Sequence, residues 1–250
     1  DVTHVEGRID PISDAETVET ELMLADLESL ERRKQGVEKK AKSGDKEAKA
    51  QVAIIQKAIV ALAAGRPART VELTEEERPA FQLLQLLTAK PVVYVCNVEE
   101  ASAATGNAFS EQVAVQAEAE GAACVVISAR IEAELAQLAP EERADYLASL
   151  GLSEPGLARL IRAGYELLGL ITFFTVGPKE ARAWTVEQGT RAPKAAGVIH
   201  TDFEKGFIRA ETIAYADYVR LGGEAGAKTE GKMRLEGKDY VVADGDVMHF

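Results

Sequence analysis

Two short polar segments each follow an apolar run directly, and their side chains could bind a ligand. Asn97-Val98-Glu99-Glu100 comes after one run, and Ser128-Ala129-Arg130 comes after the next run along the chain. In open parallel sheets, ligands bind outside the carboxyl ends of the strands, so residues in these positions are strong candidates for function. A turn of this composition also serves simply to cap a helix, and the tetrapeptide alone does not separate the two interpretations.

The two apolar runs must be strands for such a site to form. Residues 92–96 and 123–127 are short, continuous and rich in β-branched side chains, which is typical of strands buried on both faces of a parallel sheet. Between them, Ser110 to Glu120 has helical character and is followed by Gly121. The pattern predicts a right-handed β-α-β unit that places both polar segments at one edge of the sheet.

The chain before these strands predicts an antiparallel pair of helices. Apolar residues recur every three or four positions from Glu16 to about Val37 and again over residues 52–62, and Ser43-Gly44-Asp45 supplies a turn between the two stretches. Between Arg32 and Lys49 there are eight basic and three acidic residues. Candidates for contacts with nucleic-acid phosphates are Lys39, Lys40, Lys42, Lys46 and Lys49. A solvated charged loop is the alternative interpretation.

The remaining segments predict further helices and a second, β-rich region. A third helix is expected from Thr74 through Leu87, an acidic helix from Ile131 to about Leu150, and another over residues 156–168. Beyond Gly169 the chain has short strand-like runs interrupted by Gly and Pro, with a long loop after the second run and a terminal pair of runs near 240–242 and 247–250. These predict a small mixed sheet with one or two helices.

Composition limits the classes of function. Hydrophobic residues make up 46% of the 250, and no apolar run approaches the roughly 20 residues that cross a bilayer, so we expect no membrane association. The net charge of −12 gives no indication of DNA specificity. The two cysteines and three histidines have no ligand spacing, so we expect neither a disulfide nor a metal site in this chain, and a cytoplasmic location. Because residue 1 is not Met, we expect a piece of a longer chain.

The two polar segments resemble the base-binding loops of P-loop GTPases, which have the patterns Asn-Lys-x-Asp and Ser-Ala-Lys. Val98 stands in place of that Lys and Glu100 in place of that Asp, which displaces the carboxylate that binds guanine. The Asn-x-x-Glu form is similar to that of the Obg-like ATPases of the YchF type, and this resemblance implies a preference for ATP over GTP. An oxygen of Asn97 or a nearby carbonyl could then accept a hydrogen bond from the adenine amine.

Longer strings give this resemblance more specificity than the loops do. Residues 4–11 and 21–28 resemble the entry of that family into its helical insertion, and residues 174–184 and 196–207 resemble its TGS domain. The implied fold class is α/β: the C-terminal part of a P-loop NTPase parallel sheet, a helical hairpin or coiled-coil insertion, and a β-grasp domain similar to ubiquitin. The implied domains are a partial nucleotide-binding domain (1–15 and 90–150), the insertion (16–89), a connecting helix (151–167) and the TGS domain (168–250).

The resemblance also implies an activity and its limits in this chain. The family's phosphate loop and Mg²⁺ ligands precede the region matched here, and the nearest pattern, Gly222 to Thr229, has Ala227 where a glycine is required. We therefore expect a parent protein that hydrolyses ATP with Mg²⁺ as a switch on ribosomes or RNA, and no catalytic residue or activity in this chain alone. The alternative is a non-enzymatic adaptor that binds RNA or protein through the TGS domain and the basic hairpin tip.

Overall fold

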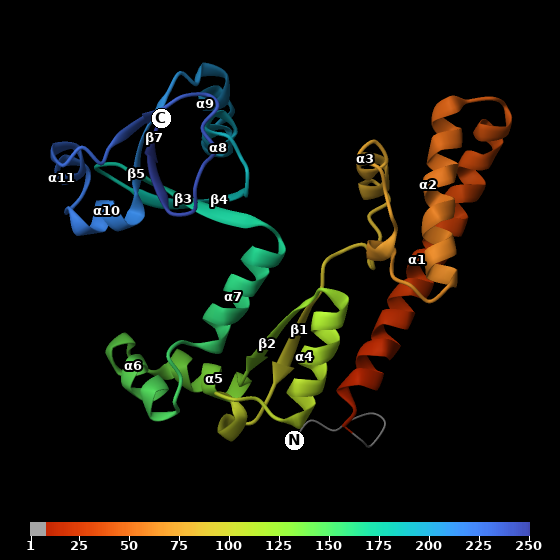
Figure 1. Cartoon of the computed structure of the whole chain (residues 1–250), viewed down its shortest axis with the longest axis horizontal. Coiled ribbons are helices and arrows are strands. Elements are labelled where there is room, and N and C mark those ends of the chain that lie inside the picture. Colours follow the sequence, from red (N-terminus) through yellow and green to blue (C-terminus); the bar gives the residue numbers. More distant parts are fainter. Residues whose placement is uncertain (1–8) are drawn as a thin grey trace. The chain divides into compact units, whose positions relative to one another are not determined.

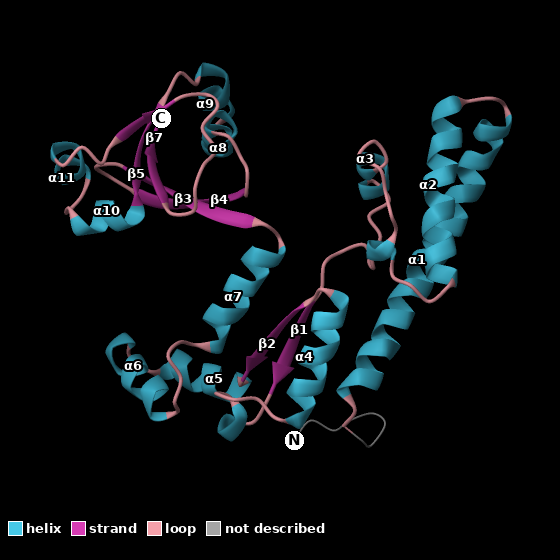
Figure 2. Cartoon of the chain, viewed as in Figure 1, coloured by secondary structure: helices cyan, strands magenta, loops and turns pink. Residues whose placement is uncertain are grey.

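The computed structural model describes residues 9–250 and divides the chain into two units, Asp1–Leu160 and Ile161–Phe250 (Figures 1 and 2). The segment 4–8 of the predicted family entry, with His4, lies outside the described residues. Among the helices of residues 9–250, none combines the length and the apolar character needed to cross a membrane.

The first unit begins with a helical hairpin, as predicted. Helix α1 (Pro11–Lys42) and helix α2 (Lys46–Ala63) pack against each other, and Gly44 turns the chain with a φ of +100°. Helix α1 is longer than expected at both ends. It starts early because Asp10 Oδ1 accepts a hydrogen bond from the Ser13 N–H at 3.2 Å and Pro11 favours the first helical position. Asp45 caps α2 in the same way.

A short irregular segment connects the hairpin to the sheet. It contains the 3₁₀ turn η1 (Ala68–Thr70) and helix α3 (Arg78–Gln82), and its apolar residues share a core with Leu30 and Ile55 of the hairpin. The prediction of a long third helix from Thr74 is wrong. Glu77 binds the Thr74 N–H and Lys57 instead of continuing a helix, and Gln85 adopts a φ of +52°, which ends the helical path.

The β-α-β arrangement is confirmed, but its strands are less buried than predicted. Strands β1 (Val93–Asn97) and β2 (Ala123–Ile127) are parallel, and helix α4 (Ala108–Glu120) connects them and packs against both. The 3₁₀ turn η2 (Glu100–Ser102) lies between β1 and α4. The prediction that both faces of β1 are buried is wrong. Helix α4 covers one face of this two-stranded sheet, and Val95 stays 42% exposed.

Three helices lie between β2 and the next strand. The predicted single acidic helix is in fact two, α5 (Ala129–Gln137) and α6 (Pro140–Ser149), because Pro140 lacks an N–H and starts a new helix instead of extending the first. Helix α7 (Gly156–Leu167) comes next and contains the boundary between the two units.

The second unit is the predicted small mixed sheet, with more helix than expected. Its strand order is β4-β3-β7-β5-β6, and only β3 and β7 are parallel neighbours. The strands are β3 (Leu170–Val176), β4 (Ala181–Glu187), β5 (Ala210–Ala214), β6 (Arg234–Glu236) and β7 (Asp246–His249). Its short helices are α8 (Ala192–Ile199), α9 (Thr201–Gly206), α10 (Tyr215–Arg220) and α11 (Glu224–Thr229).

Two expectations for this unit need correction. The predicted long loop folds as α8 and α9, because Pro193 fits the start of α8 and small residues such as Ala195 pack into the core beside Phe173. The predicted strand at 240–242 forms only a single bridge, between Arg191 and Val241.

Candidate functional site

The structure brings the two predicted polar turns together at one edge of the β1–β2 pair. Asn97 ends β1 in register with Ile127, the last residue of β2. The Asn97 Oδ1 atom accepts a hydrogen bond from the Ala129 N–H at 2.9 Å, and the Val98 N–H donates to the Ile127 carbonyl at 2.8 Å. Because Oδ1 faces the Ala129 donor, Nδ2 of Asn97 is left without a partner in the described chain and can donate to a ligand.

A charged contact joins the same two turns a second time. Nε of Arg130 lies 2.5 Å from Oε1 of Glu100 and 3.5 Å from a carboxylate oxygen of Glu134 on α5. Glu100 is partly buried, whereas the Arg130 side chain is 77% exposed. The carboxylate at the position of the Asp of P-loop GTPases therefore lies against a guanidinium of the neighbouring turn, but this contact lacks hydrogen-bond geometry, since Oε1 of Glu100 is buried without a hydrogen-bond partner in the described chain.

Glu99 supports the first turn from within. Its two carboxylate oxygens accept hydrogen bonds from the Ser102 hydroxyl at 2.5 Å and from Nδ2 of Asn107 at 3.4 Å. The hydrogen bond from Ser102 is the main cause that lowers the pKa of Glu99. Asn107 is not among the predicted site residues, although the Gly106-Asn107 pair directly before a helical segment is a helix-start signal.

Ser128 differs from the other residues of the site because it is buried. It is 3% exposed at the start of α5, and its Oγ atom has no hydrogen-bond partner in the described chain. Buried hydroxyls nearly always have a partner, so an orphaned one beside an exposed turn fits a site that is completed by a ligand or by another segment.

A groove of about 700 Å³ opens beside the first turn. Asn97, Val98 and Glu99 line it together with residues of β1 and the first turn of α4, including the 43%-exposed Phe109. The second turn does not line this groove. The groove therefore offers amide, carboxylate and apolar contacts from the first turn and from α4.

The groups of the first turn suit a purine base. An amide donor at Asn97 and an apolar side chain at Val98 match the polar edge and the apolar face of a heterocycle, whereas the buried Ser128 does not line the groove. Among residues 9–250, no group of three or more His, Cys, Asp or Glu side chains is placed to hold a metal ion.

The predicted phosphate-contacting lysines lie elsewhere, at the turn between α1 and α2. Figure 1 shows this turn at the end of the hairpin that points away from β1 and β2. Lys42 lies 3.8 Å from Glu38, and the other four have no ion-pair partner in the described part of the chain; all five are exposed: Lys39, Lys40, Lys42, Lys46 and Lys49. They form a separate surface from the two polar turns.

Cys96, Cys124 and Trp184 each contact another side chain of the fold. Sγ of Cys96 and Sγ of Cys124 lie 3.8 Å apart as free thiols on β1 and β2, and burial is the main cause that raises the pKa of Cys96 to about 11. Nε1 of Trp184 donates to the Thr175 hydroxyl at 2.9 Å, and its ring packs against the core of the second unit.

Comparison with known proteins gives consistent matches over the whole chain. Residues 170–250 match the family model YchF-GTPase_C, which is described as a protein of unknown function (DUF933). Proteins named "Ribosome-binding ATPase YchF" from Haemophilus ducreyi and Bacillus subtilis are 55% and 51% identical to this chain, and each match covers 100% of this chain and 69% of the relative.

Solved structures support the same assignment. The Schizosaccharomyces pombe YchF GTPase superposes with a TM-score of 0.85 at 34% identity, covering 100% of this chain and 68% of that one. A GTP-binding protein from Pyrococcus horikoshii OT3 gives a TM-score of 0.59 at 19% identity over 96% of this chain and 71% of that one, which shows the shared α/β fold alone. Identity above one half along the entire chain, together with this structural match, shows that the chain belongs to the YchF family.

Proposed function

We propose that this chain supplies the base-binding part of a nucleotide site that prefers ATP over GTP. The observation that carries the proposal is the 2.9 Å hydrogen bond from the Ala129 N–H to Asn97 Oδ1, which holds the two turns as one surface and directs Nδ2 of Asn97 outward. An outward amide donor can bind N7, an acceptor that adenine and guanine share. Val98, which lines the groove, packs against the ring.

Preference for adenine follows from the state of Glu100. Guanine requires a carboxylate that accepts hydrogen bonds from its ring N–H and its amine, and here Glu100 is longer than the Asp of P-loop GTPases and its Oε1 lies 2.5 Å from Nε of Arg130. A guanine bound without that carboxylate would leave donors unsatisfied, at a cost of about 1–3 kcal/mol each. The adenine amine needs only one acceptor, which the second lone pair of Asn97 Oδ1 or a main-chain carbonyl supplies.

We further propose that the phosphates and Mg²⁺ are bound by the segment of the relatives' chains that lies outside the matched region. Matched relatives are named ATPases, and the chain spans about 69% of their length. Phosphoryl transfer depends on a phosphate loop, its lysine and Mg²⁺, which supply positioning and charge. Residues 1–250 alone are accordingly expected to bind the base weakly and to lack hydrolytic activity.

The domain plan given by the family resemblance is part of the same proposal. Residues 1–15 and 90–150 form part of the nucleotide-binding domain, 16–89 its coiled-coil insertion, 151–167 a connecting helix, and 168–250 a β-grasp TGS domain. The five-stranded mixed sheet with α8 and α9 supports the last assignment.

The proposed partner is the ribosome or its RNA, which would place the protein in the cytoplasm. Relatives are named ribosome-binding. Four tip lysines have no ion-pair partner in the described chain and are exposed, so they can contact phosphates without first breaking an internal pair.

Replacement of Asn97 tests the site directly. In the full-length protein, Asn97→Ala is expected to weaken ATP binding about tenfold in calorimetric titration, because the base loses a donor and Ala129 loses its acceptor. Gln188→Ala, which removes an exposed carboxamide from the second unit, is the control. Equal ATP affinity for Asn97→Ala and the unmodified protein would refute the site, and RNA binding without any nucleotide binding would leave the adaptor function.

A further inference from the structure

We propose that Arg69 couples the hairpin to strand β1, so that changes at the base site are transmitted to α1 and changes at α1 are transmitted back. The inference rests on the proposed function only for what occupies the site, since the contacts that link α1 to β1 are all made within this chain. Coupling between two sites is reciprocal, so binding at the hairpin tip would also change nucleotide affinity.

Arg69 bridges two elements of the first unit through its guanidinium. Nη2 lies 2.5 Å from Oε1 of Glu19 on α1 and 3.6 Å from Oε2 of Glu120 at the end of α4. All three side chains are partly exposed, with exposed fractions of 19%, 27% and 24%. Ion pairs with this little exposure are screened less than surface pairs and constrain their elements more strongly.

Tyr94 extends this bridge to the strand that ends at the base site. Its hydroxyl donates to Oε2 of Glu120 at 2.9 Å, and it lies three residues before Asn97 on β1. A continuous chain of polar contacts therefore runs from β1 through Tyr94, Glu120 and Arg69 to Glu19 on α1. Movement of β1 must either move α1 or break one of these contacts.

The main chain around Arg69 is tied to α1 by a second route. Asp26 of α1 is 3% exposed, and its carboxylate accepts hydrogen bonds from the N–H groups of Leu87 and Thr88 and from the Thr88 hydroxyl, all at 2.7–2.8 Å. Thr88 in turn binds the Ala68 N–H through Oγ and the Arg69 N–H through its carbonyl, both at 3.0 Å. Arg69 thus sits where both routes meet.

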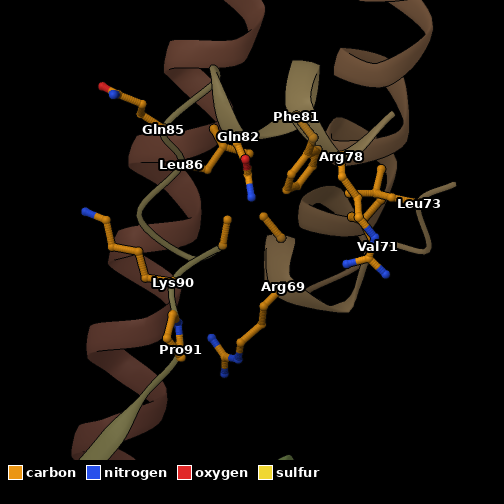
Figure 3. A pocket seen from close by; sticks show the side chains of 12 residues that line it. Arg69, Val71, Leu73, Arg78, Phe81, Gln82, Gln85, Leu86, Lys90 and Pro91 are labelled. Atoms are coloured by element: carbon orange, nitrogen blue, oxygen red, sulfur yellow. The ribbon is translucent and has the colours of Figure 1, made fainter. Parts of the chain in front are cut away.

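Arg69 also borders an open space on one side of this junction. A cavity of about 670 Å³ lies among η1, α3 and the segment that enters β1, and Figure 3 shows Arg69 at its edge, with Lys90 and Pro91 nearby and Phe81 across from them. Close-packed interiors resist displacement, whereas a segment next to an open cavity can move at lower cost. The polar contacts then add to the shared apolar core in determining how far α1 follows β1.

Hydrogen exchange on the full-length protein tests the coupling. Tyr94→Phe removes the contact between β1 and Glu120, and we expect amide exchange in residues 15–25 of α1 to rise about fivefold, the factor for removal of one side-chain hydrogen bond. In the Arg69→Met background, Tyr94→Phe is expected to have no further effect on α1. ATP is expected to change exchange in α1 of the unmodified protein and not of Arg69→Met.

Two matched controls separate coupling from general destabilisation. Tyr165→Phe removes a hydroxyl contact to Thr185 in the second unit, and Arg66→Met removes an exposed guanidinium three residues from Arg69; both should leave α1 exchange unchanged. An effect of Tyr94→Phe confined to β1 and α4, or an equal effect with and without Arg69, would overturn the coupling. If ATP does not slow amide exchange at residues 97–100, the proposed function is refuted instead. The effect of Tyr94→Phe on α1 exchange, with and without Arg69, would still decide the coupling.

Discussion

At the scale of single residues, Asp26 is the clearest case of a polar side chain that organises its surroundings. It stands on the apolar face of α1, and its carboxylate binds three donors of the segment before β1. A buried carboxylate is costly unless it is fully hydrogen-bonded, and here the bonds fix the entry of the chain into the sheet.

Replacement of Asp26 should therefore destabilise the first unit strongly. We expect Asp26→Ala to lower the free energy of unfolding by about 3 kcal/mol, because two main-chain N–H groups and a hydroxyl lose their acceptor. Asp145→Ala, at an exposed position of α6, is the control and should change it by less than about 0.5 kcal/mol. Equal melting curves for the two variants would show that the Asp26 contacts are not formed in solution.

The hydroxyls of Tyr94 and Tyr240 should ionise at higher pH than that of an ordinary tyrosine. Burial is the main cause that raises the pKa of each to about 12, and hydrogen bonds to Glu120 and Asp246 add to it. Since an unfolded tyrosine has a pKa of about 10, the protonated hydroxyls stabilise the fold fully below that pH, and the contribution is lost as pH rises through 12. Absorbance titration should show late-ionising tyrosines, and Tyr94→Phe and Tyr240→Phe should each remove one. Ionisation of both near pH 10, the ordinary value, would contradict these environments.

At the scale of helices and strands, the sequence predicts what depends on local pattern and misses what depends on distant partners. The hairpin, the turn at Gly44 and the β-α-β order follow from periodicity and turn chemistry. The short α3 could not be predicted, because Glu77 accepts a hydrogen bond from Lys57 of α2, which is twenty residues away in the sequence. The break at Pro140 is visible in the sequence, since a proline inside a helical pattern ends the helix before it, and the expectation of one long acidic helix gives this signal too little weight.

Two helical glycines should respond oppositely to alanine. A Cβ on Gly226 in α11 would lie 2.0 Å from the Leu221 carbonyl oxygen, a main-chain atom that cannot move aside. Gly226→Ala should destabilise the second unit by about 2 kcal/mol or more in thermal unfolding. A Cβ on Gly164 in α7 meets nothing within 4 Å, so Gly164→Ala should stabilise its helix by up to about 1 kcal/mol. A neutral Gly226→Ala would contradict this packing of α11 against Leu221.

The hairpin tip should act in binding through charge alone. Changing Lys39, Lys40 and Lys42 together to Ala should weaken ribosome or RNA binding and lower the slope of log K against log[salt] by about 0.7–0.9 for each phosphate that the variant no longer neutralises. The control changes three exposed lysines of the second unit, Lys205, Lys228 and Lys238. An unchanged slope in the tip variant would remove the tip from the interface.

At the scale of the whole molecule, the sequence predicts the neighbouring positions of the two polar turns but not how they are connected. Parallel strands share an edge, so Asn97 and Ser128 had to lie close together once β1 and β2 were recognised. The pairing of Glu100 with Arg130 and the route through Arg69 depend on side-chain directions across elements, which no spacing rule specifies. A charged residue within an apolar stripe, such as Asp26, is visible in the sequence and indicates such a connection.

The most direct test of the proposed base site is a side-by-side titration of the full-length protein with ATP and GTP, each with Mg²⁺. Because Glu100 is longer than the Asp of P-loop GTPases and its Oε1 lies 2.5 Å from Nε of Arg130, we propose that it binds guanine poorly, and ATP should then bind at least about tenfold more tightly. GTP binding as tight as ATP binding, or tighter, would contradict the assignment of Val98 and Glu100 to an adenine-preferring site.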